Sequence, residues 1–247
     1  MFRHKGKGRT YLHNLKLASI LSGVAGIVNI IGVLTVNTLT TNVTGHFAFF
    51  SEQLFLKNYE VAFTFLYYIF FFLFGAFISG LIMEWVSKRK SHTSYVIPIS
   101  IEITIMIMIG ISSSVLTNSD VLSPVFISSS LLFAMGLQNA LVTRISQSVV
   151  RTTHLTGLFT DLGIELSQLF FYKEKPQQII LNKSIYLKLI IIISFFFGGF
   201  IGGFCYNYFG LEALLLPAGL LLTVLWYDHL LFRYYNLKRK LRRPILK

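Results

Sequence analysis

The sequence predicts an all-α, polytopic membrane protein with six transmembrane helices in a 3+3 inverted-topology repeat. The composition predicts a membrane protein, because 54% of the 247 residues are apolar and only 13% are charged. Charged residues make up about a quarter of an ordinary soluble domain. The separation of the few charges from long apolar stretches predicts the number of helices. Two similar polar motifs, one in each half of the chain, predict the repeat.

Six apolar stretches follow one another along the chain. Each is long enough to cross a hydrocarbon core of about 30 Å as a helix. Since lipid offers the backbone no hydrogen-bond partner, helices are expected for such stretches. The first stretch follows basic residues, as in a signal peptide, but no A-x-A step follows it, so we expect an uncleaved helix. The predicted spans are 17–37, 61–83, 94–115, 122–143, 185–206 and 211–232.

The basic residues predict the orientation of these helices. Of the 22 Lys and Arg residues, all except Lys57 fall on one side of a six-span topology. The positive-inside rule therefore predicts a multi-pass protein of the plasma (inner) membrane with both termini in the cytoplasm. The chain is expected to consist of a basic N-terminus (1–16), two three-helix repeats (17–116 and 117–232) and a basic tail (233–247).

The net charge of +12 flanks the apolar stretches and does not predict binding to nucleic acid. The expected partners are the lipid bilayer and anionic headgroups at the basic termini, which attract such residues. We interpret the basic tails as solvated topology signals, and the alternative is a dedicated partner site. No cofactor or metal is expected. The single Cys205 forms neither an internal disulfide nor a metal site alone. The oligomeric state stays open.

The repeat rests on three pairs of matching segments. T-N-V-T-G-H-F at 41–47 matches T-H-L-T-G-L-F at 153–159, and F-G-A-F-I-S-G at 74–80 matches F-G-G-F-I-G-G at 197–203. A G-x-x-N step, at 26–29 and 136–139, precedes each T-x-x-T-G motif. Because each half holds an odd number of spans, the halves have opposite orientations. Inverted repeats of this kind build many transporters, with the binding site at the repeat interface.

The segment that follows each motif is too short to cross a membrane. Residues 46–56 and 158–172 are apolar and aromatic, and we expect a half-helix in each that either enters the membrane or lies at its surface. Threonine and Asn42 are good N-cap residues, and glycine is expected to supply a flexible break. Pro98 and Pro217 are expected to bend the third and sixth spans.

Small residues recur at four-residue spacing in several spans, as at Ser22 and Gly26 and at Gly198 and Gly202. This spacing places small side chains on one helix face and lets two backbones approach closely. We therefore interpret these residues as helix-packing positions and not as binding residues.

Three segments carry a resemblance to a known family. They are N-V-T-G at 42–45, G-L-Q-N-A at 136–140, and V-R-T-T-H-L-T-G at 150–157, which continues through T-D-L-G at 160–163. On these residues the chain resembles the YoaK-like family of bacterial inner-membrane proteins, whose domain has no assigned function. The resemblance covers almost the whole chain and implies a polytopic membrane protein without a transferable activity. Relatives are expected to carry an acidic residue where this chain has Asn29.

The two motifs are the candidate binding site. Two half-helices in inverted repeats would bring their N-terminal ends together, and helix N-termini attract anions. Hydroxyls, amides and one arginine lie on or near the motifs, while the alternative is that these groups only cap broken helices. The candidate substrate-binding residues are Asn29, Thr41, Asn42, Thr44, Gly45, Asn139, Arg151, Thr153, His154, Thr156 and Gly157.

Two carboxylates are candidates for coupling transport to an ion. Glu102 lies within the third predicted span, where an ionisable group is costly and often functional. Asp161 follows the second motif. The alternative for Glu102 is a structural carboxyl that is protonated or paired with an arginine.

These features favour a transporter or channel for a small polar or anionic solute. The first alternative is a membrane partner or assembly factor that transports nothing. A less favoured alternative is an intramembrane enzyme, because the chain has no H-E-x-x-H, G-x-S-x-G or P-loop motif.

Overall fold

The computed structural model describes residues 2, 9–89, 93–115 and 123–241. These residues form eight α-helices and one 3-10 helix, and they contain no β-strand, which confirms the prediction of an all-α chain. The elements are α1 (Tyr11–Val36), α2 (Val43–Phe55), α3 (Tyr59–Arg89), α4 (Val96–Val115), α5 (Pro124–Ser146), α6 (Leu155–Gln168), α7 (Lys175–Phe209), η3 (Gly210–Leu214) and α8 (Leu215–Leu241).

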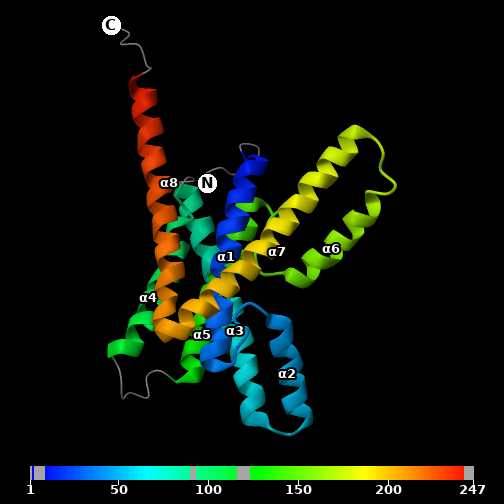
Figure 1. Ribbon diagram of the computed structural model, residues 1–247. Coiled ribbons are helices and arrows are strands. Elements are labelled where there is room, and N and C mark those ends of the chain that lie inside the picture. The colour runs from blue at the N-terminus through cyan, green and yellow to red at the C-terminus, as the bar shows by residue number, and fades with distance from the viewer. Residues whose placement is uncertain (1, 3–8, 90–92, 116–122, 242–247) are drawn as a thin grey trace.

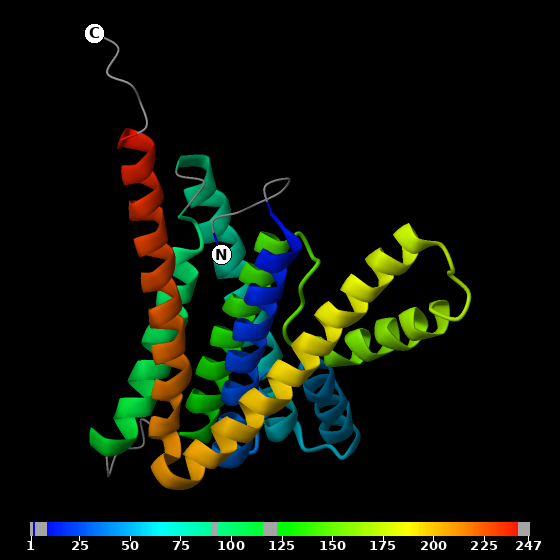
Figure 2. The same cartoon turned by 45° about the horizontal axis from the view of Figure 1, so that its top comes forward.

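Each of the six predicted spans overlaps an α-helix, but α7 begins at Lys175, well before the predicted 185, and the last span begins in η3 and continues in α8 to Leu241, well past the predicted 232. Within the described part of the chain, four segments are long and apolar enough to cross a membrane: Tyr11–Val36, Tyr59–Lys88, Pro124–Ser146 and the continuous segment Lys175–Leu231. Val96–Ser112 in α4 is a shorter apolar helix. The start of α1 and the end of α8 lie toward the same end of the molecule (Figures 1 and 2). Six crossings and the 3+3 repeat remain predictions.

The predicted basic termini are partly helical. Helix α1 begins at Tyr11 and α8 continues to Leu241. Thr10 caps α1, where its hydroxyl accepts a hydrogen bond from the backbone N–H of His13 at 3.4 Å. The rest of the basic N-terminus (1 and 3–8), residues 90–92 with the basic Lys90, the boundary between the predicted repeats (116–122) and the end of the tail (242–247) lie outside the described residues.

Two helix pairs cross at very short backbone distances. A methyl group added at Gly26 of α1 would lie 2.1 Å from the carbonyl oxygen of Phe195 on α7. A methyl group added at Gly136 of α5 would lie 2.1 Å from the carbonyl oxygen of Phe72 on α3. Only glycine fits at these two positions, so the expected role of small residues in helix packing holds there.

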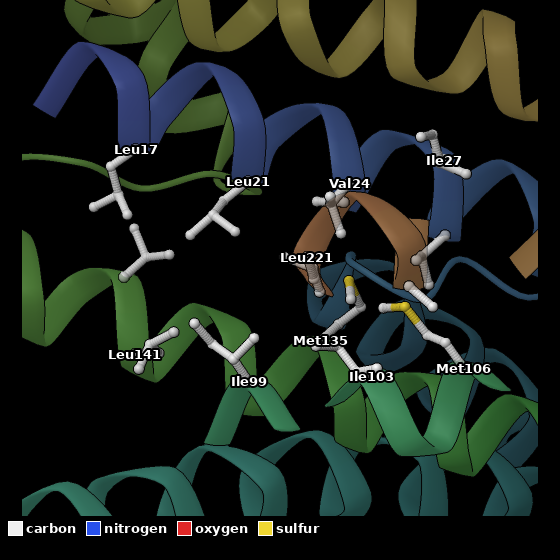
Figure 3. Close-up of a cluster of buried hydrophobic side chains, with 14 of the residues drawn as sticks. Leu17, Leu21, Val24, Ile27, Ile99, Ile103, Met106, Met135, Leu141 and Leu221 are labelled. Carbon is white, nitrogen blue, oxygen red and sulfur yellow. The ribbon is translucent and has the colours of Figure 1, made fainter. Parts of the chain in front are cut away.

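The core lies where α1, α4, α5 and α8 meet (Figure 3). Its side chains are aliphatic or methionine apart from Phe2 and Tyr95, and they interdigitate between helices that are far apart in the sequence. The labelled core residues are Leu17, Leu21, Val24, Ile27, Ile99, Ile103, Met106, Met135, Leu141 and Leu221.

The chain reverses after α7 at Gly210. Its φ of 55° with ψ of −135° is a conformation that is essentially restricted to glycine. The prediction that proline bends the third and sixth spans is wrong. Pro98 and Pro217 lie in the first turns of α4 and α8, where the missing N–H has no helical partner to lose.

Candidate functional site

Both T-x-x-T-G motifs start short helices, as predicted. Asn42 is the N-cap of α2, and its Oδ1 accepts a hydrogen bond from the N–H of Gly45 at 3.1 Å. His154 is the N-cap of α6, but its side chain makes no capping hydrogen bond. The first backbone N–H groups of α6 are therefore without a side-chain cap, which favours an anionic group at this end of the helix.

The prediction that glycine breaks the chain within each motif is wrong. Gly45 and Gly157 lie in the first turns of α2 and α6, and Gly210 is the only described glycine with a positive φ. Their role is spatial. A methyl group added at Gly157 would lie 2.4 Å from the ring of His154, and one added at Gly45 would lie 3.2 Å from the amide of Asn42. Each glycine leaves room for the cap side chain.

One asparagine in each half holds the loop that leads into its motif. Asn29 Oδ1 accepts hydrogen bonds from the hydroxyl and the backbone N–H of Thr41, at 3.0 and 3.3 Å. Asn139 Oδ1 accepts hydrogen bonds from the hydroxyl of Thr153 at 2.8 Å and from that of Thr152 at 3.4 Å. Among the described residues the side-chain N–H groups of both asparagines make no hydrogen bond, so they are available as donors.

The two motifs meet at one cavity of about 540 Å³. Every predicted substrate-binding residue lies in its wall except Gly45 and Gly157. Sequence reasoning missed several residues of the wall. One of them, Thr143, could have been predicted because it lies one helical turn after Asn139. The wall consists of Asn29, Leu39, Thr41, Asn42, Val43, Thr44, Phe72, Asn139, Thr143, Arg151, Thr153, His154, Leu155, Thr156 and Phe195. We call this space the motif cavity.

The motif cavity is rich in hydrogen-bond donors. Arg151 carries a positive charge in its wall, and no carboxylate lies in the wall as the described residues form it. In the described part of the chain, the hydroxyls of Thr44 and Thr156 make no hydrogen bond, so both can bind a ligand. No group of three His, Cys, Asp or Glu side chains that could hold a metal occurs among these residues either.

Residues 17–227 match the family described as "Protein of unknown function (DUF1275)". The chain belongs to the DUF1275 family. This agrees with the prediction of a family without an established function, although the family description does not contain the YoaK-like name. Neither the curated proteins nor the solved structures contain a match to the chain.

A second cavity of this DUF1275 protein lies between α6 and α7 and also measures about 540 Å³. It shares Arg151 and His154 with the motif cavity, and Gly157 and Asp161 belong to its wall. Lys188, also in this wall, donates a hydrogen bond to Glu165 at 2.7 Å. Ser184 links the pair, since its hydroxyl donates to Glu165 at 2.7 Å and accepts from Lys188 at 2.8 Å.

The matching place between α2 and α3 is filled by aromatic rings. By alignment of the repeated segments, Phe49, Phe65 and Tyr68 occupy the positions of Asp161, Lys188 and Ile191. The rings of Phe49 and Phe65 stack with centroids 5.2 Å apart. His46 joins them, with its ring centroid 5.6 Å from that of Tyr68 and 6.0 Å from that of Phe65. We call His46, Phe49, Phe65 and Tyr68 the aromatic cluster.

His46 is held within the aromatic cluster by a backbone hydrogen bond. Its Nε2 lies 2.8 Å from the carbonyl oxygen of Leu39, to which it donates as the neutral ring. Burial lowers the pKa of His46, and the hydrogen bond to Leu39 opposes this effect. The ring is therefore neutral near pH 7, so the cluster carries no charge.

The candidate coupling carboxylates lie in different places in this DUF1275 protein. Asp161 is exposed and lines the second cavity. Glu102 is 1% exposed on α4 and lies in the wall of neither cavity. Within the described residues, both of its carboxyl oxygens lack a hydrogen-bond partner. A coupling role for either residue stays a prediction.

Sequence reasoning missed a buried carboxylate in the sixth predicted span. Asp228 of α8 is 3% exposed, and its Oδ2 accepts a hydrogen bond from the hydroxyl of Tyr95 at 2.5 Å. The signal was available, because an ionisable residue in an apolar span is unusual. The bond ties α8 to the residue that precedes α4, so the structure gives Asp228 a packing role away from the motif cavity.

Proposed function

We propose that this protein transports a small anionic solute across the plasma (inner) membrane through the motif cavity, and that two inverted repeats form this cavity. One observation carries the proposal: the N-terminal ends of α2 and α6, which come from similar segments of the two halves, line the same donor-rich space. In transporters with inverted repeats, helix N-termini of discontinuous segments commonly point at the anionic group of the substrate.

The wall of the motif cavity supports the repeat because all of its residues except Thr143 fall into matching pairs. The alignment of the repeated segments pairs residues that face the same space from the two halves. Figures 1 and 2 support opposite orientations, since α2 and α6 leave the centre of the molecule in different directions. The pairs are Asn29 with Asn139, Leu39 with Arg151, Thr41 with Thr153, Asn42 with His154, Val43 with Leu155, Thr44 with Thr156, and Phe72 with Phe195.

The helix crossings support the same repeat. Gly26 contacts Phe195, and Gly136 contacts Phe72. The alignment of the repeats pairs the two glycines with each other and the two phenylalanines with each other, so the two contacts are equivalent. In both contacts the first helix of one half packs on a helix of the other half, α1 on α7 and α5 on α3. The cavity then lies between the halves, where a relative movement of the halves would change access to it.

The chemistry of the wall favours an anion. The wall offers the amide N–H groups of Asn29 and Asn139, the hydroxyls of Thr44 and Thr156, and the guanidinium of Arg151. Donors of this kind bind an anion more strongly than a neutral solute, and a helix N-terminus adds a partial positive charge. The absence of a carboxylate from this described wall argues against a cationic solute.

The surroundings of the cavity favour access from one side. The polar second cavity adjoins the motif cavity at Arg151 and His154, whereas the aromatic cluster fills the matching place in the first half. Under the predicted topology the side with the second cavity faces the cytoplasm. We therefore assign an inward-open arrangement in which the aromatic cluster closes the outer path.

The experiment is uptake into liposomes that contain the purified protein. The probes are radiolabelled acetate, phosphate and sulfate, with radiolabelled glycerol as a neutral comparison. The test variant combines Thr44→Val with Thr156→Val, which removes two donors from the wall while keeping the side-chain shape. The control combines Thr64→Val with Thr104→Val, whose hydroxyls bond within their own helices and lie outside the cavity.

We expect the protein to accelerate uptake of at least one anion but not of glycerol. The test variant should lower that uptake at least about tenfold, because a hydrogen bond to a charged group contributes about 1.5–3 kcal/mol. The control should transport normally. If none of the three anions moves, or if the test variant equals the control, the proposal is wrong.

A further inference from the structure

A third cavity of about 690 Å³ lies along the α1–α7 crossing. Apart from Asn29, its wall is apolar or glycine, and one edge is formed by residues of α6. We call this space the apolar groove. Its wall consists of Gly26, Asn29, Ile30, Leu34, Leu155, Phe159, Ile192, Phe195, Phe196, Gly199, Phe200, Gly203 and Phe204.

The apolar groove and the motif cavity are neighbours with a common wall. Asn29, Leu155 and Phe195 line both spaces. Asn29 is the polar member of the groove wall, and its amide oxygen is held by Thr41 at 3.0 Å. A polar, donor-rich chamber therefore adjoins an apolar channel at a fixed asparagine.

Glycines make the groove deep. At Gly26 the α1 and α7 backbones meet too closely for any side chain. Gly199 and Gly203 are different, because an added methyl group would lie 3.6 Å from the nearest atom at Gly199 and 3.5 Å at Gly203, which is ordinary contact. Packing alone therefore leaves room for alanine at both positions, and glycine there keeps the groove open.

We propose that the anion bound by this protein carries an alkyl chain, with its charged head in the motif cavity and its chain in the apolar groove. This inference rests on the proposed anion site and names the class of its substrate, a single-chain anionic amphiphile. The wall shared by the motif cavity and the apolar groove favours this ligand, because one molecule with a charged head and an alkyl chain can occupy both spaces. A small hydrophilic anion would leave the groove unused, and a bulk lipid chain would not need the adjoining donors.

The groove contributes selectivity more than affinity. An alkyl chain in the bilayer is already in an apolar medium, so moving it into an apolar groove gains little hydrophobic free energy. The charged head gains hydrogen bonds and the field of Arg151, and the groove orients the chain so that the head can reach them. Binding should therefore require both parts of the ligand and both parts of the site.

The experiment measures binding of radiolabelled hexadecanoate to the whole protein in lipid nanodiscs, together with acetate uptake as described above. Gly203→Leu places a side chain in the groove. Gly80→Leu is the matched control, since Gly80 holds the same position in the first half, has no atom within 4 Å of an added methyl group, and lies outside the groove wall. Arg151→Gln tests the contribution of the head.

We expect Gly203→Leu to weaken hexadecanoate binding at least about tenfold and to leave acetate uptake unchanged. Arg151→Gln should weaken both, and Gly80→Leu should change neither. Hexadecanoate binding that either Gly203→Leu or Arg151→Gln leaves unchanged is adventitious lipid binding and overturns the inference. If the wild-type protein takes up no acetate but binds hexadecanoate, and Gly203→Leu weakens that binding, the transport proposal is wrong and the inference about the ligand class stands.

A second measurement uses only the wild-type protein, so it does not require any variant to fold. Hexadecanoate with a photoreactive diazirine at the chain end is bound to the wild-type protein, irradiated, and the labelled peptides are identified by mass spectrometry. The inference predicts labelling within the groove wall, at residues such as Leu34 or Phe204, and competition by excess unlabelled hexadecanoate. Labelling spread evenly over the lipid-facing helices overturns it.

Discussion

Gly26→Ala tests the helix crossing that positions the motif cavity. The added methyl carbon would lie 2.1 Å from the carbonyl oxygen of Phe195, whereas ordinary van der Waals contact begins at 3.4 Å. The two backbones must therefore separate by about 1.3 Å, the difference between these distances. Asn29 lies three residues further on the same helix face, so the separation also moves an amide of the cavity wall.

The net effect combines two opposing contributions. Overpacking of a close contact costs about 1–3 kcal/mol, and a clash between backbones is at the upper end because neither atom can rotate away. Alanine in place of glycine in a helix gains about 1 kcal/mol. We therefore expect Gly26→Ala to lower the free energy of unfolding by about 2 kcal/mol, and Gly136→Ala to do the same because its methyl group meets Phe72 at the same distance.

Gly80→Ala should have the opposite sign, since an added methyl group there meets no atom within 4 Å and only the propensity gain of about 1 kcal/mol remains. The assay is reversible unfolding in mixed detergent micelles, followed by circular dichroism. A difference of about 3 kcal/mol between Gly26→Ala and Gly80→Ala is expected. Equal stabilities for these two variants would refute the crossing geometry.

Three further predictions concern single side chains. Gly157→Ala should displace the ring of His154, whose atoms lie as close as 2.4 Å to the added methyl group, and should lower anion uptake without changing the charge of the site; normal uptake would exclude a positional role for this ring. Lys188→Ala should lower stability by about 1–3 kcal/mol, because it leaves the mostly buried carboxylate of Glu165 without its cation; thermal unfolding with a Lys188→Ala, Glu165→Ala double variant as the comparison measures the coupling. Glu102→Leu should raise stability by about 1–3 kcal/mol, because its buried carboxyl oxygens lack partners within the described chain; a less stable variant would reveal an interaction that these contacts do not contain.

Much of the candidate site could be predicted because polar residues are conspicuous in apolar segments. Asn29 and Asn139 are the amides at the end of each G-x-x-N step, and both lie in the cavity wall. The threonines were found by repetition, since the same short motif occurs twice. Thr143 was missed although it lies one helical turn after Asn139. Phe195 was not found, because it has the character of an ordinary residue in a membrane helix until a neighbouring helix defines which face borders the cavity.

The roles of the two glycines show where local reasoning stops. Glycine after a threonine is compatible with a break, a cap or a close contact, and sequence alone does not separate these. The backbone at Gly157 is helical, and its importance lies in the ring of His154 beside it. Such a contact depends on a side-chain rotamer, which a pattern of residue types does not encode.

By itself the sequence determined the helical class, the positions of the apolar helices, the two short helices after them and the matching motifs. These follow from local properties: apolar length, capping residues and repetition. The tertiary structure decided that α1 crosses α7, that α5 crosses α3, and that a polar chamber adjoins an apolar groove. The physical reason is that helices with apolar residues on every side carry no periodic signal for the partner of each face. Glycine marks where two backbones can meet, but only the assembled bundle shows which two do.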